Sequence, residues 1–451
     1  MENERKERLC PYPFYGKENT LYGQVHIVSQ EWDGESGVTV RVNVSLLNSN
    51  MVREELEAVE TDHALLYFYE FTGEHTFEVP HTGEEHILKY HEVPDLFKQE
   101  RNTFRRVQII PVEQAGSDTY ENDNRIYFEG ELLFSASPIL SHKTTLVIEE
   151  GPVPSHDWKN IKKIFDHWDI TRKNRCITDD TVIRTKLNNL FYTKVTSACV
   201  DIYHAAQANC ICCTVNGKKI MYDVGITRDE QDRNSLQVQS ALGEIARLQA
   251  EAVFLSHWDL DHILGVCYNP SFLMQKLWIA PDFEKLYDKI PLAVQRLCNY
   301  LLVEGKSTVC LIDTQSKTKN YFTSRDDKIS IYLGTPRAAY GINRANNGGL
   351  LLRIENQKSI LLPGDCENTL FSNFAAQREL DYVVIPHHGS YMSDPFVKGK
   401  KGKVNVAYIC RGKHPGHCNY DSDIKSKYRR KNFKIVRNTM YLRKNKYSIK
   451  L

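Results

Sequence analysis

Long hydrophobic runs are missing from this sequence of 451 residues. No stretch reaches the roughly 18 consecutive apolar residues that a membrane-spanning helix requires. The first residues, Met1–Lys6, are mostly charged and no apolar core follows them, so a secretory signal is not expected. The 12 cysteines show no disulfide-framework spacing, which favours free thiols in a reducing compartment. These absences predict a cytoplasmic protein that makes no use of a membrane.

Net charge is also nearly absent, at +1, but the charges are segregated along the chain. From Asp394 to Leu451 there are 17 Lys and Arg against 3 Asp and Glu, a net charge of +14. The preceding 393 residues carry 41 Lys and Arg against 54 Asp and Glu, a net charge of −13. A basic segment on an acidic body predicts an anionic partner, nucleic acid first, although a solvated basic surface gives the same count.

Residues 1–145 contain no cluster of catalytic or metal-binding side chains at ligand spacing. They are rich in alternating, β-branched and aromatic segments, at 22–29, 38–47, 64–71, 107–112 and 125–134. Turn dipeptides such as Asp33-Gly34 and Thr82-Gly83 separate them. This pattern predicts a β-rich accessory domain, sandwich-like or a barrel, that recognises or packs against a protein partner.

Residues 146–190 are expected to form a helical connector. Pro152 and Pro154 precede apolar positions spaced by three or four residues, from Trp158 to Trp168, which is typical of a helix with one packing face. Residues 191–451 alternate strands with helices and place polar residues at strand ends. This alternation predicts an αββα layered sandwich. With the β-rich first part, the expected fold class of the whole chain is α+β.

Four metal-binding side chains fall within the short segment Ser256-His-Trp-Asp-Leu-Asp-His262: His257, Asp259, Asp261 and His262. The apolar run Ala252–Leu255 precedes them and predicts a buried strand. Side chains at a strand end are held more firmly than those on a free loop. The sequence therefore predicts a site at this strand end.

Two later strand ends carry the same kinds of residue. Asp365 follows Ser359–Leu362, and His387-His388 follows Leu380–Ile385. Histidine and carboxylate together suit Zn²⁺, Mn²⁺ or Fe²⁺ better than a thiolate site. The set is large enough for two ions about 3.5–4 Å apart, the arrangement used to activate water for phosphoryl and acyl hydrolysis.

The motifs resemble those of the metallo-β-lactamase fold in their order along the chain. They are Asp223-Val-Gly225, His257-x-Asp259-x-Asp261-His262, Gly364-Asp365 and Pro386-His-His-Gly-Ser390. Within that superfamily the chain is most similar to the soluble hydrolase domain of ComEC-type DNA-uptake proteins, over about residues 195–440. Asn346-Asn347 and Gly412-Lys-His-Pro-Gly-His417 belong to the same resemblance.

The resemblance implies a role for each matching residue. His257 and Asp259 would bind a first ion, Asp261 and His262 a second, and Asp365 would bridge the two. His388 or His387 would be the last ligand or a phosphate contact, which makes Asp261, Asp365 and His388 the implied catalytic residues. Asp223 would orient the ligand loop by hydrogen bonding. Substrate oxygens would be held by Asn347, Ser390 and His417.

Three departures from the family pattern matter. Asp259 stands where a histidine is usual, as in the ComEC-like group, and no histidine occurs from Ile263 to Pro386. The first ion is therefore one ligand short unless His387, His417 or an asparagine supplies it, or the site holds a single ion. The Gly-Gln-Gly-Asp step common in the family is here Ala206-Gln-Ala-Asn209.

These observations predict a hydrolase that uses one or two divalent ions, Zn²⁺ or Mn²⁺. The favoured activity is that of a phosphodiesterase or nuclease acting on DNA, because the basic segment after the last ligands would guide a phosphate backbone into the cleft. One alternative is a small-molecule ester, lactone or thioester hydrolase. Another is a non-catalytic binding module, against which unused, mutually repelling buried ligands argue.

Overall fold

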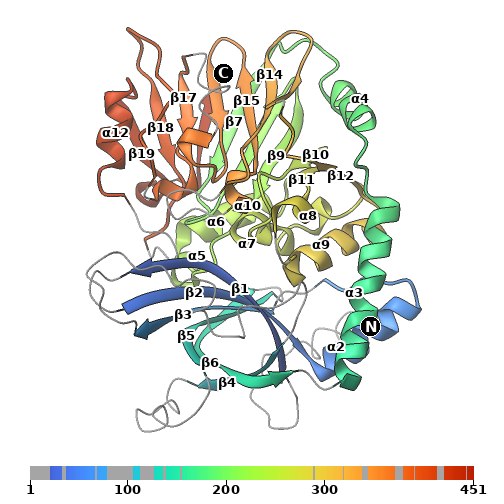
Figure 1. The fold of residues 1–451 in the computed structure, drawn as a ribbon. Coiled ribbons are helices and arrows are strands. Elements are labelled where there is room, and N and C mark those ends of the chain that lie inside the picture. Colours follow the sequence, from blue (N-terminus) through green and yellow to red (C-terminus); the bar gives the residue numbers. More distant parts are fainter. Residues whose placement is uncertain are drawn as a thin grey trace. The chain divides into compact units, whose positions relative to one another are not determined.

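The computed structural model describes most of the chain (Figure 1). The described residues are 21–32, 37–66, 69–78, 105–111, 126–135, 139–152, 155–287, 290–317, 319–337, 344–370, 379–390, 392–413, 421–442 and 444–451. Two compact units form. Unit 1 contains Met1–Asn174 and Asp288–Glu304, and unit 2 contains Arg175–Tyr287 and Gly305–Leu451. Unit 1 therefore includes one segment whose sequence interrupts unit 2.

Unit 1 is built on β strands, in keeping with its β-rich sequence. The strands are β1 (Leu21–Trp32), β2 (Gly37–Asn48), β3 (Tyr69–Glu78), β4 (Arg105–Pro111), β5 (Ile126–Ser135) and β6 (Ile139–Pro152). They close into a barrel in the order β1-β2-β3-β5-β6-β4, and neighbouring strands pair antiparallel. Of the two arrangements that the pattern allowed, the chain adopts the one that leaves no open sheet edge. Its last strand runs past residue 145.

The described residues of unit 1 also form the helices α2 (Ser49–Glu60), α3 (Ser155–Arg175) and α9 (Leu292–Val303). The apolar face predicted for α3 is confirmed, since Ile161, Ile164 and Trp168 are buried in the same cluster as the barrel strands. Tyr22 of β1 also donates a hydrogen bond to Asp157 of α3 at 2.6 Å. No helix in the described ranges is both long and apolar enough to cross a membrane.

Helix α9 belongs to unit 1 although its sequence lies between strands of unit 2. Arg296 Nη2 lies 2.8 Å from Glu55 Oε1 of α2, and both side chains are buried. A separate short helix, α8 (Phe283–Leu286), precedes α9 along the chain, and Pro291, the N-cap residue of α9, disfavours helical backbone in the residue before it.

Unit 2 contains two seven-stranded sheets (Figure 1). The first has the order β12-β11-β10-β9-β8-β7-β20, with β7 (Ala198–Tyr203), β8 (Cys210–Val215), β9 (Lys218–Val224), β10 (Ala252–Phe254), β11 (Leu277–Pro281), β12 (Thr308–Ile312) and β20 (Lys446–Lys450). The second runs from β13 to β19 in chain order, with β13 (Asn320–Thr323), β14 (Ile329–Leu333), β15 (Leu350–Glu355), β16 (Ser359–Leu362), β17 (Tyr382–Val384), β18 (Val406–Ile409) and β19 (Ile435–Asn438).

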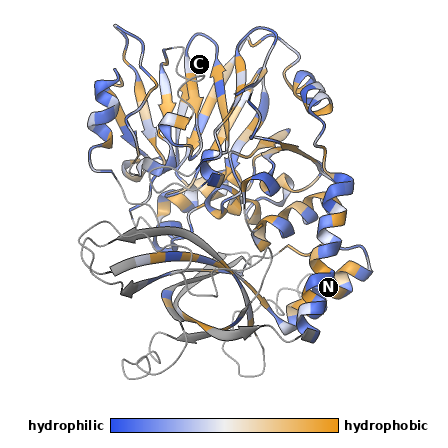
Figure 2. Cartoon of the chain, in the orientation of Figure 1, coloured by the Kyte–Doolittle hydropathy of each residue, from blue (hydrophilic) through white to orange (hydrophobic). Residues whose placement is uncertain are grey.

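The two sheets of unit 2 pack face to face. Residues from both, such as Ile211 and Phe254 of the first and Leu352 and Ile360 of the second, form one buried cluster. The outer face of the second sheet is covered by α12 (Ile424–Arg430), whose Ile424 and Tyr428 pack with Leu361 and Ile409. Figure 2 shows the sheet strands largely apolar and α12 largely hydrophilic.

Parallel pairing in the middle of each sheet decides where the strand ends meet. In the first sheet β9, β10, β11 and β12 are parallel to one another, and in the second β16, β17, β18 and β19 are parallel. Loops that leave the carboxyl ends of parallel strands share one edge of a sheet, the usual place for a site in such folds. The residues that follow β10, β16 and β17 are the candidate ligands.

Candidate functional site

The segment after β10 forms the first wall of the site. It turns at once into the short helix α7 (Leu260–Ile263), for which Asp259 is the N-cap residue. His257 and His262 are buried, whereas Asp259 and Asp261 remain partly exposed. The turn brings the two imidazole rings to 4.0 Å between centroids. A buried strand end followed by a tight turn thus gathers the predicted residues of this segment.

Asp223 at the end of β9 braces this wall, as the resemblance implied. Its Oδ1 accepts from the Ser256 backbone N–H at 2.6 Å, and its Oδ2 accepts from Ser256 Oγ and from His262 Nδ1, each at 2.8 Å. A carboxylate can only accept, so the Nδ1 atom of His262 carries its proton. The Nε2 atom is then the nitrogen that faces the site, and it would offer its lone pair to a bound ion.

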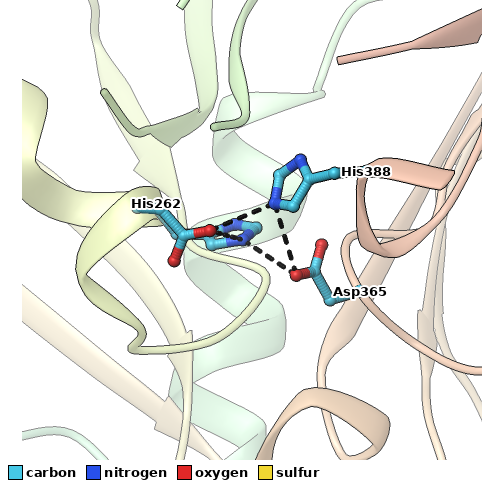
Figure 3. Close-up of side chains that lie close together, drawn as sticks. His262, Asp365 and His388 are labelled. Atoms are coloured by element: carbon cyan, nitrogen blue, oxygen red, sulfur yellow. Dashed lines mark hydrogen bonds and ion pairs between the residues drawn. The ribbon is translucent and has the colours of Figure 1, made fainter. Parts of the chain in front are cut away.

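Four side chains converge beside this wall: Asp261, His262, Asp365 and His388, each with a ligand atom within 4.8 Å of the others. His388 Nε2 lies 3.1 Å from Asp261 Oδ2 and 3.5 Å from Asp365 Oδ2. His262 Nε2 lies 3.3 Å from the same oxygen of Asp365. Figure 3 shows the labelled side chains of His262, Asp365 and His388 pointing toward one another. The structure thus places residues from α7 and from two loops of the second sheet around one point.

The orientation of His388 is set by the strand next to its own. Its Nδ1 lies 3.0 Å from the carbonyl oxygen of Cys410, the residue that follows β18. A carbonyl accepts only, so Nδ1 donates and Nε2 is left to face Asp261 and Asp365. Both histidines of the four-residue group are therefore held in the tautomer that a metal ligand requires.

The spacings of this group fit a bound divalent cation. Zn²⁺ holds nitrogen and oxygen ligands at about 2.0–2.2 Å in a tetrahedron, which separates neighbouring ligand atoms by roughly 3.4 Å. The distances of 3.1, 3.3 and 3.5 Å lie around that value. His262 Nε2 is buried, and among the described residues it has no hydrogen-bond partner. Histidine and carboxylate donors also suit Mn²⁺ and Fe²⁺.

His257 and Asp259 form a looser second group. His257 Nε2 lies 3.5 Å from Asp259 Oδ2 and 4.0 Å from Asp365 Oδ2, and it too is buried without a hydrogen bond to any described residue. Asp365 is thus close to a histidine of each group, and its bridging role stays a prediction. In the described part of the chain, the mutually close group of ligand atoms does not include His257 or Asp259.

Tyr287 is a residue of this second group to which no sequence pattern points. Its hydroxyl donates to Asp259 Oδ1 at 2.8 Å. Burial, together with the charge of Asp259, raises the pKa of Tyr287 well above its ordinary value, so the hydroxyl stays a donor. A tyrosine 28 positions away from a carboxylate shows no motif spacing, and only the folded chain places the two together.

Electrostatics in the pocket favour positive charge. Burial alone lowers the pKa of His262, but Asp365, Asp223 and Asp261 outweigh it and raise that pKa well above the ordinary value. Burial alone raises the pKa of Asp365, but His262 and His388 hold it well below its ordinary range. Carboxylates that stay ionised while buried need cationic partners. A divalent cation satisfies the same need.

Left-handed backbone is concentrated at the site. Four of the ten described non-glycine residues with positive φ are here: Ala206, Asp223, His387 and His388. Each such residue costs on the order of 1–3 kcal/mol and persists only where its surroundings enforce it. Ala206 occupies the loop where the family usually has glycine, so this loop keeps a glycine-like conformation without the glycine. Asn209 of the loop donates from Nδ2 to Asp365 Oδ1 at 3.5 Å.

Two glycines allow the walls to approach each other. A Cβ on Gly225 would lie 1.7 Å from the carbonyl oxygen of Asp261, and one on Gly364 would lie 2.6 Å from Cβ of Ser256. Gly364 also has a φ of +60°, which an L side chain rarely adopts. Each of the motifs Asp-Val-Gly and Gly-Asp therefore places a carboxylate of the site close to a glycine, whose lack of a side chain lets the neighbouring wall approach.

The remaining predicted residues lie in different places. His387 precedes His388 but is outside the group of four. Ser390 is buried, and its Oγ has no hydrogen-bond partner among the described residues. His417 lies outside the described residues. Asn347 donates from its amide to the carbonyl of Arg337 and accepts from the backbone N–H of Glu367, so it braces the loop after Asp365. Its assignment as a substrate contact stays a prediction.

Comparisons with known proteins add little to this geometry. No protein-family model and no curated protein matches the sequence. A solved structure described as a new diphosphatase from the PhnP family is similar at 9% identity and a TM-score of 0.29. The similarity covers 54% of this chain and 87% of that one. At this level of likeness the neighbour carries no argument about activity.

Proposed function

We propose that the protein is a metal-dependent hydrolase with an αββα metallo-β-lactamase-like unit. One observation carries the proposal: Asp261, His262, Asp365 and His388 converge with their ligand atoms within 4.8 Å of one another, and both imidazoles have Nδ1 bonded away from the centre. Chance burial of two histidines and two carboxylates gives no reason for both rings to have Nδ1 bonded away from the centre and Nε2 turned toward the carboxylates.

The group of four would hold a tightly bound divalent ion, which corresponds to the second ion of the resemblance. His257 and Asp259, sharing Asp365, would hold the other ion more weakly. A divalent ion bound there lowers the pKa of water and stabilises negative charge on reacting oxygens. The chain itself orients His262 through Asp223, orients His388 through Cys410, and keeps Asp365 ionised through the two histidines.

The substrate we propose is a phosphodiester, and specifically nucleic acid, with DNA favoured over RNA. What supports it is the resemblance to ComEC-type domains together with the net charge of +14 from Asp394 to Leu451. Ser390 is the residue we assign to a substrate oxygen, since its buried hydroxyl has no described partner. His387, on the same turn as His388, is assigned to a phosphate contact.

The test is turnover of several substrate classes by the same preparation. Purified protein is incubated with labelled DNA, labelled RNA, a chromogenic phosphodiester, and ester, lactone and thioester substrates, with Mn²⁺, Zn²⁺ or EDTA. Phosphodiester cleavage that needs the ion and is lost in Asp261→Ala supports the proposal. The exposed Asp313→Ala is the matched control and should keep full activity.

Other outcomes contradict the proposal in defined ways. Ester or lactone turnover without phosphodiester cleavage would replace the substrate class but keep the metal centre. Elemental analysis that finds no bound Zn, Mn or Fe in the wild-type protein, together with no turnover, would leave a binding module.

A further inference from the structure

The basic segment of the sequence does not gather at the candidate site. Strand β18 ends beside Cys410, whose carbonyl holds His388, so the carboxyl end of this strand is the site end. Lys401 and Lys403 precede β18 and therefore lie toward its opposite end. With strands rising about 3.3 Å per residue, the four residues of β18 separate the two ends by roughly 13 Å.

Two more lysines join that far end. Strand β19 is parallel to β18, with Val406 opposite Ile435. Lys431 and Lys434 precede β19, and the Lys431 carbonyl accepts a hydrogen bond from the backbone N–H of Gly399 at 2.8 Å. These four lysines therefore lie about one strand length from the candidate ligands, although they follow those ligands in the sequence.

The charge continues along the sheet edge to the site end. Arg437 is exposed on β19, the last strand of the second sheet. Lys425, in the first turn of α12, lies 5.8 Å from the ring of Tyr441, which is 69% exposed. Thr439 lies between Lys425 and Tyr441 in the sequence. Its hydroxyl hydrogen-bonds the backbone of Arg411, the residue after Cys410. Figure 1 shows α12 and β19 together at this edge of the sheet.

We call this surface the basic strip: Lys401, Lys403, Lys431, Lys434, Arg437 and Lys425. None of the six pairs with a carboxylate within 4 Å in the described part of unit 2, whereas Lys400 and Lys427 nearby are paired with Asp381 and Asp421 at 2.6 and 2.7 Å. A row of exposed cations without counter-charges attracts a polyanion, whose binding releases the counterions that otherwise screen the row.

We propose that the basic strip binds the phosphodiester backbone of a nucleic acid and leads it along β19 to the candidate site. Phosphates follow one another at about 3.4 Å of axial rise in a duplex strand, so about four nucleotides cover the length of β18. The strip thus selects polymers over short diesters. This inference rests on the proposed function, but binding to the strip is measurable without catalysis.

The experiment measures binding in EDTA, where hydrolysis cannot interfere. Full-length protein is titrated into fluorescent duplex DNA, single-stranded DNA and RNA, each about 30 nucleotides long, at several salt concentrations, and in parallel into vesicles that contain phosphatidylserine. The variant Lys401→Glu/Lys434→Glu/Arg437→Glu should bind nucleic acid about tenfold or more weakly. The slope of log affinity against log salt should fall by about one for each phosphate that the variant no longer neutralises.

A charge-matched control separates the strip from net charge. Lys194, Lys219 and Lys306 are exposed lysines elsewhere in unit 2, and their triple replacement by Glu changes the net charge equally. This variant should keep most of the affinity and the salt slope. Both variants should hydrolyse the short chromogenic diester at the wild-type rate, and only the strip variant should show a raised KM for DNA.

The outcomes distinguish this inference from the function on which it rests. If the two variants weaken nucleic-acid binding equally, the proposal that the strip binds nucleic acid is wrong, even if DNA is cleaved. Loss of binding to the anionic vesicles alone, with nucleic-acid binding unchanged, would also overturn it. Selective loss of nucleic-acid binding supports the strip even if no phosphodiester is cleaved. The three nucleic-acid probes then tell which polymer the strip prefers.

Discussion

A buried ion pair in unit 1 and the candidate site in unit 2 balance their charges in different ways. In unit 1, Glu55 is buried against Arg296 at 2.8 Å, a pair of opposite charges. In unit 2, Asp223, Asp261 and Asp365 are gathered around histidines, and no described Lys or Arg forms an ion pair with any of these three. The first arrangement pairs one cation with one anion. The second directs carboxylates and histidine nitrogens at one point, which distinguishes a candidate site from a structural pair.

The positions of residues with positive φ also differ between the two units. Among the described residues of unit 1, Asp62 is the non-glycine residue with positive φ, and it lies in the turn after α2. In unit 2, strained positions coincide with Asp223, His387 and His388. The comparison predicts that removal of a buried charge lowers stability in unit 1 and lowers metal affinity in unit 2.

The largest effect on stability is expected in unit 1. Glu55→Ala leaves Arg296 buried without its partner, which should lower the free energy of unfolding of this unit by about 3–5 kcal/mol. Urea unfolding followed by circular dichroism measures it, and metal stoichiometry should not change. The double variant Glu55→Met/Arg296→Met should recover most of the loss, because two apolar side chains pack without leaving a charge behind. A loss below about 1 kcal/mol in the single variant would mean that the pair is dispensable.

A smaller effect, on metal affinity, is expected for Asp223→Asn in unit 2. The new amide would present a donor to His262 Nδ1, which turns the proton onto Nε2 and removes the lone pair from the site. Loss of such an orienting residue weakens metal binding by about 10- to 100-fold, measured by chelator competition.

Asp381→Asn is the matched control for this prediction. Asp381 is also buried, and its carboxylate accepts from the backbone and hydroxyl of Ser359, as that of Asp223 does from Ser256. Its replacement should lower stability and leave metal affinity unchanged. Equal metal affinity in the wild-type and Asp223→Asn proteins would remove Asp223 from the site.

The smallest effect is expected for Tyr287→Phe. One hydrogen bond to Asp259 is lost, worth about 0.5–1.5 kcal/mol, so the weaker ion should bind up to about tenfold less tightly. The tightly bound ion should be unaffected, since Asp259 lies outside the group of four. Isothermal titration calorimetry with Mn²⁺ resolves the two affinities.

Tyr321→Phe controls for the loss of a tyrosine–aspartate hydrogen bond. Tyr321 donates to Asp180 at 2.9 Å, and neither residue is near the ligand loops in sequence. It should leave both affinities unchanged. A single binding event in the wild-type protein, unaltered by Tyr287→Phe, would show that His257 and Asp259 bind no ion.

Local patterns pointed to strand-end residues that the fold brings together, but not to several of their hydrogen-bond partners. His257, Asp259, Asp261 and His262 follow a strand and lie within six positions, so short-range geometry brings them together. Asp365 and His388 were predicted because each follows a strand that was visible as an apolar run. The hydrogen bonds of Asn347 to Arg337 and Glu367 were not predicted, since they depend on a loop packing that no periodicity reveals.

The sequence alone determined two features. Alternating apolar residues predicted a β-rich first part, and polar residues at strand ends predicted a set of ligands in the second part. Tertiary structure decided the rest. Residues far apart in sequence are joined by the closure of the barrel, by the inclusion of α9 in unit 1 and by the Tyr287–Asp259 hydrogen bond. The positions of the basic residues along β19 also depend on how the strands pair. Such contacts depend on which strands pair and in which direction. That choice minimises the free energy of the whole unit, so no short segment contains it.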